Sequence, residues 1–251
     1  MSKHLPFDPL EYFPIEVKDT LFESCKDTWI MHEAERVMIL SMLRNLKPEV
    51  AIDCGTAHGG SLSAIAKYAK KVYTLDYDPT CKERFGKEFP NAEFISGDIN
   101  ETLPKLMEQI NKKGENLEFI LLDAQHSRQG ICKEINSILK YKPQKHLFII
   151  IHDSFIPECR EGIKEANWKD CPWVHFIELD FVSGVYGYQC KNDRKMTCGL
   201  AFVLLRAIPR QGSITFHEKN RGNFENLYPI SIHANTLRNR IRGKLSRWKR
   251  F

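Results

Sequence analysis

The sequence predicts an α/β fold with a mostly parallel seven-stranded sheet, an antiparallel last strand and helices on both faces. Short apolar runs rich in β-branched or aromatic residues recur from about residue 48 onward, with amphipathic stretches of helical length between them. This alternation is typical of βαβ units. The runs are apolar at consecutive positions, as strands buried on both faces are. The chain of 251 residues is long enough for one such domain with short terminal additions.

The expected elements follow one another in a regular order. The strands are expected at residues 50–54, 72–76, 93–96, 117–123, 147–153, 174–179 and 200–206. The helices between them are expected at residues 61–70, 80–88, 103–112, 130–141 and 158–168. The loop over residues 180–199 holds no helix of crossover length. We therefore expect a hairpin-type antiparallel connection between the last two strands.

One further helix is expected before the sheet, over residues 27–46. Ile30, Ala34, Val37 and Leu40 recur there at spacings of 4, 3 and 3, which gives the segment an apolar face. The chain is thereby divided into three parts. An N-terminal cap segment with its helix is expected over residues 1–46, the core over 47–208 and a C-terminal extension over 209–251.

The extension is expected to end in a basic amphipathic helix. Residues 236–251 hold seven Lys and Arg and no acid, so the rest of the chain is slightly acidic although the net charge is +5. Leu237, Ile241, Leu245 and Trp248 form an apolar stripe between these charges. Such a helix can lie on an anionic membrane surface, bind RNA phosphates or dock on another subunit. A solvated tail is the remaining alternative.

Composition sets further limits on the class of protein. No apolar run approaches the ~18 residues that a membrane span needs, and residues 1–10 lack the apolar stretch of a secretory signal. Eight cysteines are scattered without a C-x-x-C pair, which disfavours a zinc site or a disulfide framework. Reduced thiols and a cytoplasmic location are therefore expected.

A glycine-containing loop over residues 51–61 joins the first strand to its helix. Gly55 and Gly59 allow a tight turn and close approach of a ligand. Their spacing differs from the Gly-x-Gly-x-x-Gly that cradles a dinucleotide pyrophosphate, which disfavours a nicotinamide oxidoreductase. Asp53 would repel a phosphate and suits a ligand with an amino group and a sulfonium. An ordinary βα turn is the simpler alternative.

Acidic residues end the next two strands. Asp76 lies 21 positions after Gly55, where a carboxylate can accept hydrogen bonds from both ribose hydroxyls. Asp98 ends the third strand, where an adenine amine would lie, and Tyr77 or Ile99 could pack on the ring. Each acid alone is also compatible with a strand-end turn, but the ordered set favours a nucleoside ligand.

This ordered set resembles the first motifs of class I S-adenosylmethionine-dependent methyltransferases. Residues 57–62, Ala-His-Gly-Gly-Ser-Leu, are more narrowly similar to the cephalosporin-hydroxylase-type and macrolide-sugar O-methyltransferase branch. The resemblance covers about residues 27–206. It implies a Rossmann-like class I methyltransferase fold and S-adenosylmethionine as the methyl donor. The cofactor-binding residues that it implies are Asp53, Gly55, Thr56, Gly59, Gly60, Ser61, Asp76, Tyr77, Asp98, Ile99 and Asp123.

Two more acids follow the fourth and fifth strands. Asp123-x-x-His126 resembles the motif of metal-dependent sugar O-methyltransferases, in which the Asp binds Mg²⁺ and the His is the general base. The resemblance thus makes Asp123 and His126 the expected catalytic residues. Such a pair suits hydroxyl methylation, because a metal lowers the pKa of the hydroxyl and an imidazole removes its proton. A helix-start residue with a local hydrogen bond is the alternative for His126.

The sequence departs from that family after the fifth strand, where two adjacent acids are usual and His152-Asp153 stands instead. Mg²⁺ prefers oxygen ligands, which a histidine at position 152 does not supply, whereas Asp123 and Asp153 remain candidate Mg²⁺ ligands. His152 could face the core, bind a softer metal or contact the substrate. Without a metal, His126 could still act as the base. Glu33, before the core, could contact the donor or the acceptor, or be a solvated helix charge.

The resulting hypothesis is O-methylation of a sugar or another polyhydroxylated small molecule, as in carbohydrate biosynthesis. The expected partners are a glycoside acceptor, a second copy of the chain in a homo-oligomer and a membrane surface contacted by the C-terminal helix. The alternative is a nucleic-acid-binding protein or RNA methyltransferase that uses the basic tail. The slightly acidic body disfavours nucleic acid, because a nucleic-acid channel should be basic near its site.

Overall fold

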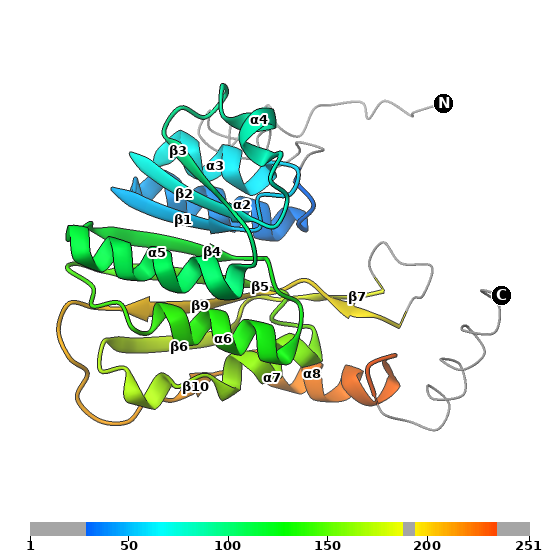
Figure 1. The fold of residues 1–251 in the computed structure, drawn as a ribbon. Helices are drawn as coiled ribbons and strands as arrows, with labels where there is room; N and C mark the ends of the chain where they lie inside the picture. Colours follow the sequence, from blue (N-terminus) through cyan, green and yellow to red (C-terminus); the bar gives the residue numbers. More distant parts are fainter. Residues whose placement is uncertain (1–28, 188–193, 235–251) are drawn as a thin grey trace, which may run out of the picture.

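The computed structural model describes residues 29–187 and 194–234. Eight strands form one sheet in the order β10-β6-β9-β5-β4-β1-β2-β3 (Figure 1). Neighbouring strands are parallel except at β9, which is antiparallel to both β5 and β6. The strands are β1 (Val50–Cys54), β2 (Lys71–Asp76), β3 (Ala92–Ser96), β4 (Leu117–Leu122), β5 (Leu147–His152), β6 (Val174–Val182), β9 (Leu200–Leu205) and β10 (Phe216–His217). A separate ribbon pairs β7 (Val185–Tyr186) with β8 (Met196–Thr197).

Helices cover both faces of the sheet (Figure 1). One apolar core packs α5, α6 and α7 on the first face, and a second packs α2 and α3 on the other. The α-helices are α2 (Glu33–Leu46), α3 (Gly60–Tyr68), α4 (Cys81–Phe85), α5 (Ile99–Lys113), α6 (Arg128–Ile138), α7 (Pro157–Glu165) and α8 (Arg221–Leu227). Two 3₁₀ helices, η2 (Trp168–Asp170) and η3 (Tyr228–Ile230), complete the described elements.

The central strands are apolar throughout because both of their faces are buried. Every residue of β1 is buried, and neighbouring residues face opposite cores: Ile52 packs with α5 to α7, whereas Ala51 packs with α2 and α3. The expected Rossmann-like α/β fold is confirmed, including the antiparallel pairing of β6 and β9. The sheet has an eighth strand, β10, which the sequence did not reveal because two residues carry no periodic pattern.

Two helices begin four or more residues away from the positions that the sequence predicts, whereas the others begin within two residues of them. The helix expected from residue 27 begins at Glu33, because His32 is its N-cap and the Glu35 carboxylate accepts a hydrogen bond from the His32 N–H at 2.8 Å. The helix expected from residue 103 begins at Ile99, because the Asp98 side chain caps it by accepting from the Asn100 N–H at 2.9 Å.

The division of the chain into a cap, a core and an extension stays a prediction. The strand β10 carries residues beyond 208 onto the edge of the sheet, parallel to β6. The basic helix predicted over residues 236–251 lies outside the described residues, as does most of the N-terminal cap segment. Among residues 29–187 and 194–234, no helix combines the length and apolar character that crossing a membrane requires.

A buried ion pair attaches the extension to the core. The Arg160 guanidinium on α7 donates to both carboxylate oxygens of Asp180 on β6, at 2.9 and 3.2 Å. The side chains are 1% and 2% exposed. The Asn220 N–H also donates to Asp180, at 3.0 Å, and Glu218 lies 3.5 Å from Arg160. Both charges are thereby compensated, which a buried pair requires.

We predict that Arg160→Ala lowers the free energy of unfolding by about 3–5 kcal/mol, because it leaves the buried Asp180 carboxylate without its cation. Urea unfolding followed by circular dichroism measures this change. Arg128→Ala is the matched control, since the ion pair of Arg128 with Glu165 is exposed and such pairs contribute about 0–1 kcal/mol. Equal losses in the two variants would contradict the prediction.

Candidate active site

The carboxyl ends of the parallel strands bring five predicted aspartates to one edge of the sheet. Asp53 lies within β1 and Asp76 ends β2, while Asp123 and Asp153 directly follow β4 and β5. Asp98 follows β3 after one glycine. We call these five residues the rim. Ligands of open parallel sheets bind outside this edge, so the rim is the first candidate for a site.

The glycine loop above β1 has the backbone conformation that its glycines were expected to provide. Gly55 has φ +103°, and a Cβ there would lie 2.7 Å from the Asp123 carbonyl oxygen. Gly59, at φ +79°, is the N-cap of α3. Ala57 is held at φ 42° and donates its N–H to Asp76 at 2.8 Å. The loop is therefore fixed between the ends of three strands.

Asp53 supports this loop from below. It is fully buried, accepts a hydrogen bond from the Thr74 hydroxyl at 3.0 Å, and the same hydroxyl contacts that of Thr56 at 2.6 Å. Burial raises the pKa of Asp53 to about 7, against hydrogen bonds from Ser61 and Thr74 that lower it. Its direct contact with a donor amino group stays a prediction.

The other nucleoside-side residues differ in how accessible they are. Asp76 is half-buried and accepts from the N–H groups of Ala57 and Asp78, both at 2.8 Å. Tyr77 is 82% exposed beside it, whereas Ile99 is buried in the core. Asp98 uses its carboxylate to cap α5. Tyr77, rather than Ile99, is thus the side chain that is free to pack on a ring.

A small cavity lies between the glycine loop and the segment that precedes α2. Its volume is about 50 Å³, and its lining includes residues 29–31, Gly55, Ser61 and Asp123. Pockets for ligands of drug-like size enclose roughly 300–1,000 Å³. A nucleoside-sized ligand would therefore extend beyond this cavity, and residues 29–31 form one of its walls.

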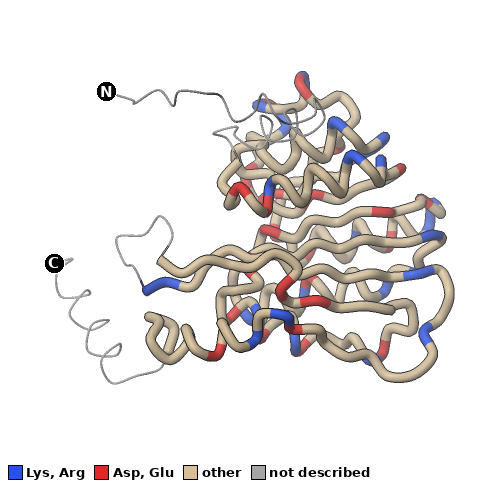
Figure 2. Tube along the Cα trace, turned by 180° about the vertical axis from the view of Figure 1, so that it is seen from behind, with Lys and Arg blue, Asp and Glu red and all other residues tan. Residues whose placement is uncertain are grey.

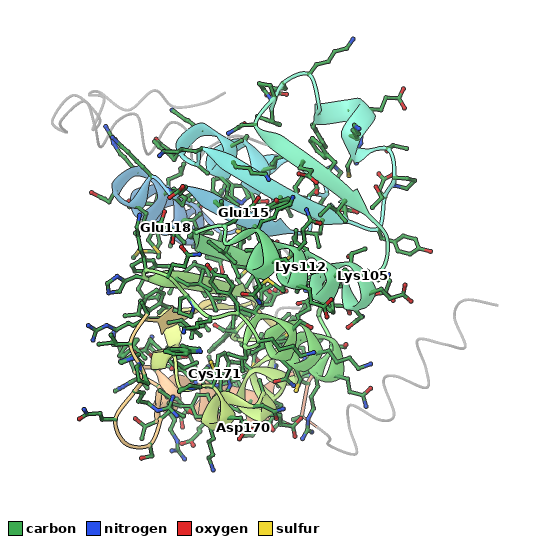
Figure 3. The ribbon with its side chains drawn as sticks, turned by 60° about the vertical axis from the view of Figure 1, so that its left-hand side comes forward. Lys105, Lys112, Glu115, Glu118, Asp170 and Cys171 are labelled. Atoms are coloured by element: carbon green, nitrogen blue, oxygen red, sulfur yellow. The ribbon has the colours of Figure 1, made fainter. Side chains whose placement is uncertain are left out.

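A larger hollow, of about 590 Å³, lies at the opposite edge of the sheet. Its charged groups pair with one another, as Lys71 Nζ does with Glu115 Oε1 at 3.1 Å. Figure 3 shows Glu115 and Glu118 at this edge, beyond Lys105 and Lys112 of α5. The residues that line this larger hollow include none of the predicted site residues. We place the site at the rim because parallel sheets bind ligands at the carboxyl ends of their strands.

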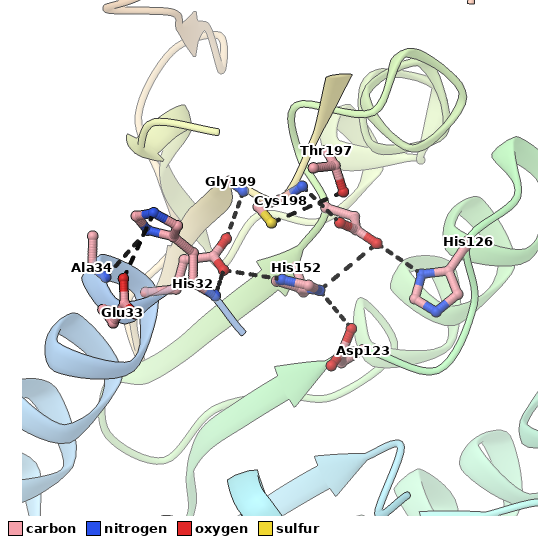
Figure 4. Close-up of polar contacts among 11 residues, drawn as sticks. His32, Glu33, Ala34, Asp123, His126, His152, Thr197, Cys198 and Gly199 are labelled. Carbon is pink, nitrogen blue, oxygen red and sulfur yellow. Dashed lines mark hydrogen bonds and ion pairs between the residues drawn. The ribbon is translucent and has the colours of Figure 1, made fainter. Parts of the chain in front are cut away.

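Next to the loop and the rim lie two histidines and three acids, which we call the histidine centre: Glu35, Asp123, His126, His152 and Asp153. Figure 4 labels Asp123, His126 and His152 of this group. His152 Nδ1 lies 2.7 Å from Asp123 Oδ1, and His152 Nε2 lies 3.3 Å from Glu35 Oε2. Burial lowers the pKa of His152, but the charge and hydrogen bond of Asp123 and the contact with Glu35 hold it well above its ordinary value.

His126 forms the second pair of the histidine centre. Its Nδ1 lies 3.0 Å from Asp153 Oδ2, and its side chain is 56% exposed. The hydrogen bond that His126 donates to the Asp153 carboxylate raises the pKa of His126 against the lowering effect of burial. Burial raises the pKa of Asp153, but the hydrogen bond with His126 and the charge of His152 outweigh this effect, so the pKa lies below its ordinary value. His126 is therefore oriented by a carboxylate and open to solvent.

The turn that carries Asp153 is strained and tightly held. Asp153 has φ 60° and Cys198 has φ 62°, left-handed conformations that residues other than glycine rarely adopt. The Cys198 N–H donates to Asp153 Oδ1 at 3.0 Å, and the Gly199 N–H donates to Glu35 Oε1 at 2.5 Å. Backbone strain of this kind gathers at functional sites.

Glu35 is the residue of this site that sequence reasoning missed. Glu33, the acid of this helix that was expected to contact the donor or the acceptor, is exposed and lies 3.8 Å from Arg36. Glu35 lies four residues before the buried Ile39, so its position on the apolar face of α2 was the available signal. A buried carboxylate on such a face requires polar partners.

The contacts of the histidine centre do not fit the expected Mg²⁺ site at Asp123 and Asp153. The third nearby ligand atom is a ring nitrogen of His152, within 4.8 Å of both carboxylates. Both nitrogens of that ring already face carboxylate oxygens. Mg²⁺ prefers oxygen ligands in octahedral geometry and keeps several waters, so this set of donors does not suit it.

Comparison with known proteins identifies the family of the chain. The model of a family described as rhamnosyl O-methyltransferase/CmcI matches residues 24–203, which confirms the resemblance to class I methyltransferases. A search of the curated proteins finds no match.

Solved structures share the fold at low sequence identity. The O-methyltransferase TomG from Streptomyces achromogenes, involved in tomaymycin synthesis and in complex with SAM, has a TM-score of 0.54 and 11% identity, over 78% of this chain and 91% of that one. Cofactor-bound Rv0187 from MTB has a TM-score of 0.52 and 15% identity, over 82% and 94%. An O-methyltransferase from Bacillus cereus in complex with SAH has a TM-score of 0.50 and 14% identity, over 81% and 93%.

A further acid is buried beneath the rim. Glu134 on α6 is 1% exposed, and within the described residues neither of its carboxylate oxygens has a hydrogen-bond partner. Burial, with a smaller contribution from the charge of Asp123, raises its pKa from 4.5 to about 8. The folded chain thus holds a proton that the unfolded chain releases.

We predict that the free energy of unfolding falls as the pH rises from 4.5 towards about 8, because the folded state binds the Glu134 proton throughout that window. Glu134→Gln should make this fall shallower, since the amide does not titrate. Urea unfolding at a series of pH values measures both profiles. Glu108→Gln, an exposed position on α5, is the control that should change nothing. Parallel profiles for the Glu134 variant and the natural chain would count against the raised pKa.

Proposed function

Since the chain belongs to the rhamnosyl O-methyltransferase/CmcI family, we propose that this S-adenosylmethionine-dependent methyltransferase acts on a hydroxyl group of a sugar or a similar polyhydroxylated small molecule. The observation that carries the proposal is the His126–Asp153 pair beside the glycine loop, at 3.0 Å. It places a candidate base next to a candidate donor site. The family description supports a sugar as the acceptor.

The donor is proposed to lie across the ends of β1 and β2. The glycine loop would pass around its amino acid portion, and Asp76 would accept hydrogen bonds from the ribose hydroxyls. Tyr77 is exposed at the position where it could stack on the adenine. Residues 29–31 line the small cavity beside the loop, so they would cover the bound donor.

The chemistry follows from the position of His126. Asp153 holds Nδ1, which leaves Nε2 to take the proton of the acceptor hydroxyl. The hydroxyl oxygen attacks the methyl carbon of the donor as the carbon–sulfur bond breaks. The products are a methyl ether and S-adenosylhomocysteine, and the proton remains on His126 until solvent removes it. The exposed side chain allows an acceptor to reach it.

Nucleic acid is a poor acceptor for this site. The rim is lined with aspartates, and Figure 2 shows Lys and Arg interspersed with Asp and Glu along the described chain. A polyanion would require a basic channel near the reacting atoms. The tail on which the RNA alternative depends lies outside the described residues. Homo-oligomerisation, membrane-surface contact, a cytoplasmic location and a role in carbohydrate biosynthesis stay predictions.

We predict that Asp76→Ala weakens binding of S-adenosylhomocysteine by roughly 1–3 kcal/mol, because ribose hydroxyls lose their acceptor. Isothermal calorimetry with the full-length protein measures this change. Asp170→Ala removes an exposed aspartate of η2 and should leave the affinity unchanged. Tight binding of NAD without binding of the adenosyl compound would refute the donor assignment.

We predict that His126→Ala lowers kcat by about 10²–10⁴-fold with nearly unchanged donor affinity, because a base acts only in the transition state. The rate should rise with pH through the His126 pKa, which lies above 6.5, since only the neutral ring accepts a proton. Asp153→Asn should move this limb to lower pH by removing the charge that raises the pKa.

A panel of glycosides, assayed by mass shift, supplies the acceptor for these rate measurements. His146→Ala, at the far end of β5, is the matched control and should retain full turnover. If His126→Ala binds the donor poorly or unfolds, His126 is a structural residue. If it turns over normally with the true acceptor, the base lies elsewhere.

A further inference from the structure

The imidazole of His152 occupies the space between the carboxylates of the histidine centre. Its Nδ1 lies 2.7 Å from Asp123 Oδ1, and its Nε2 lies 3.3 Å from Glu35 Oε2. Both ring nitrogens are therefore engaged with carboxylate oxygens, one on each side of the ring.

Glu35 cannot turn away from this contact without losing other bonds. Its carboxylate, which is 0% exposed, accepts from the Gly199 N–H at 2.5 Å and from the His32 N–H at 2.8 Å. Two fixed backbone donors thus set the direction from which Glu35 meets His152. The same carboxylate closes the capping box of α2.

The ring nitrogen also lies beside the two carboxylates that were expected to bind a divalent ion. The ligand atoms of Asp123, His152 and Asp153 lie within 4.8 Å of one another, and His152 Nδ1 is 3.7 Å from Asp153 Oδ2. An ion held by the two aspartates would therefore have a ring nitrogen as its third nearby ligand atom. Because that nitrogen already contacts Asp123 Oδ1, the ion and the ring compete for the same carboxylate oxygen.

We propose that the His152 side chain, held by Glu35 and Asp123, takes the place of a divalent metal ion in this chain, so that the site requires no bound metal. The inference rests on the proposed function only for the statement that this centre carries out methyl transfer. The ring bridges the carboxylates of Asp123 and Glu35, while His126 remains the base. His152 is thus a positioning residue that orients Asp123 without touching the reacting atoms.

The decisive variant is His152→Glu, which replaces the ring with a third oxygen ligand beside Asp123 and Asp153. Full-length protein is treated with a chelator, dialysed and titrated with Mg²⁺, Mn²⁺ and Zn²⁺ by calorimetry, without donor or acceptor. We expect no saturable binding to the natural chain. The variant should bind Mg²⁺ and Mn²⁺ at least about tenfold more tightly than the natural chain, because hard cations prefer carboxylate oxygens.

His146→Glu is the matched control, because it adds the same charge at the other, exposed end of β5. It should bind none of the three ions. Mg²⁺ should also raise the thermal midpoint of His152→Glu alone, as a ligand specific to the folded state does. If crowding of carboxylates prevents folding, the double variant Glu35→Gln, His152→Glu removes one charge and carries the same expectation.

Two results would overturn the inference: saturable binding of any of the three ions to the natural chain, or a folded variant that binds neither Mg²⁺ nor Mn²⁺. A separate measurement compares methyl transfer by the natural chain with and without chelator, and loss of turnover in chelator would also overturn it. Failure to methylate any glycoside would count against the proposed function, while the binding results would still decide the role of His152.

Discussion

The contact between Glu35 and His152 is the interaction on which the rest of the site depends. A carboxylate with no solvent access is tolerated only where donors surround it, and Glu35 draws these donors from three separate segments. They are the N-cap of α2, the end of β5 and the turn before β9. The same bonds that satisfy one buried charge therefore set the positions of the cap, the sheet and the strained turn.

The contacts of Glu35 and Gly55 link the glycine loop with its cavity to the histidine centre. Residues 29–31 line the cavity beside the glycine loop, and α2 begins directly after them with Glu35 in its first turn. Movement of residues 29–31 would therefore act on α2, whose Glu35 contacts His152. On the other side, a Cβ at Gly55 would meet the backbone of Asp123, so the loop also limits where that carboxylate can lie.

The fold could be predicted from the sequence, because strands buried on both faces leave continuous apolar runs. The rim could also be predicted, because each aspartate follows such a run. The partners of these residues could not. Glu35 meets His152 across 117 positions of sequence, and a lone acid in an amphipathic helix is typical of a solvated face. Asp153, which pairs with His126, has a left-handed backbone conformation, and no sequence motif predicts this conformation.

The position of β9 affects how the chain folds during its synthesis. This strand lies between β5 and β6, although it follows both in sequence. During synthesis, the edges of β5 and β6 that pair with β9 therefore stay unpaired until residues 200–205 leave the ribosome. The turn at Cys198 and Gly199 arrives at the same moment, so the surroundings of His152 are completed last. A nascent chain that already contains every rim aspartate would still lack the pocket in which they act together.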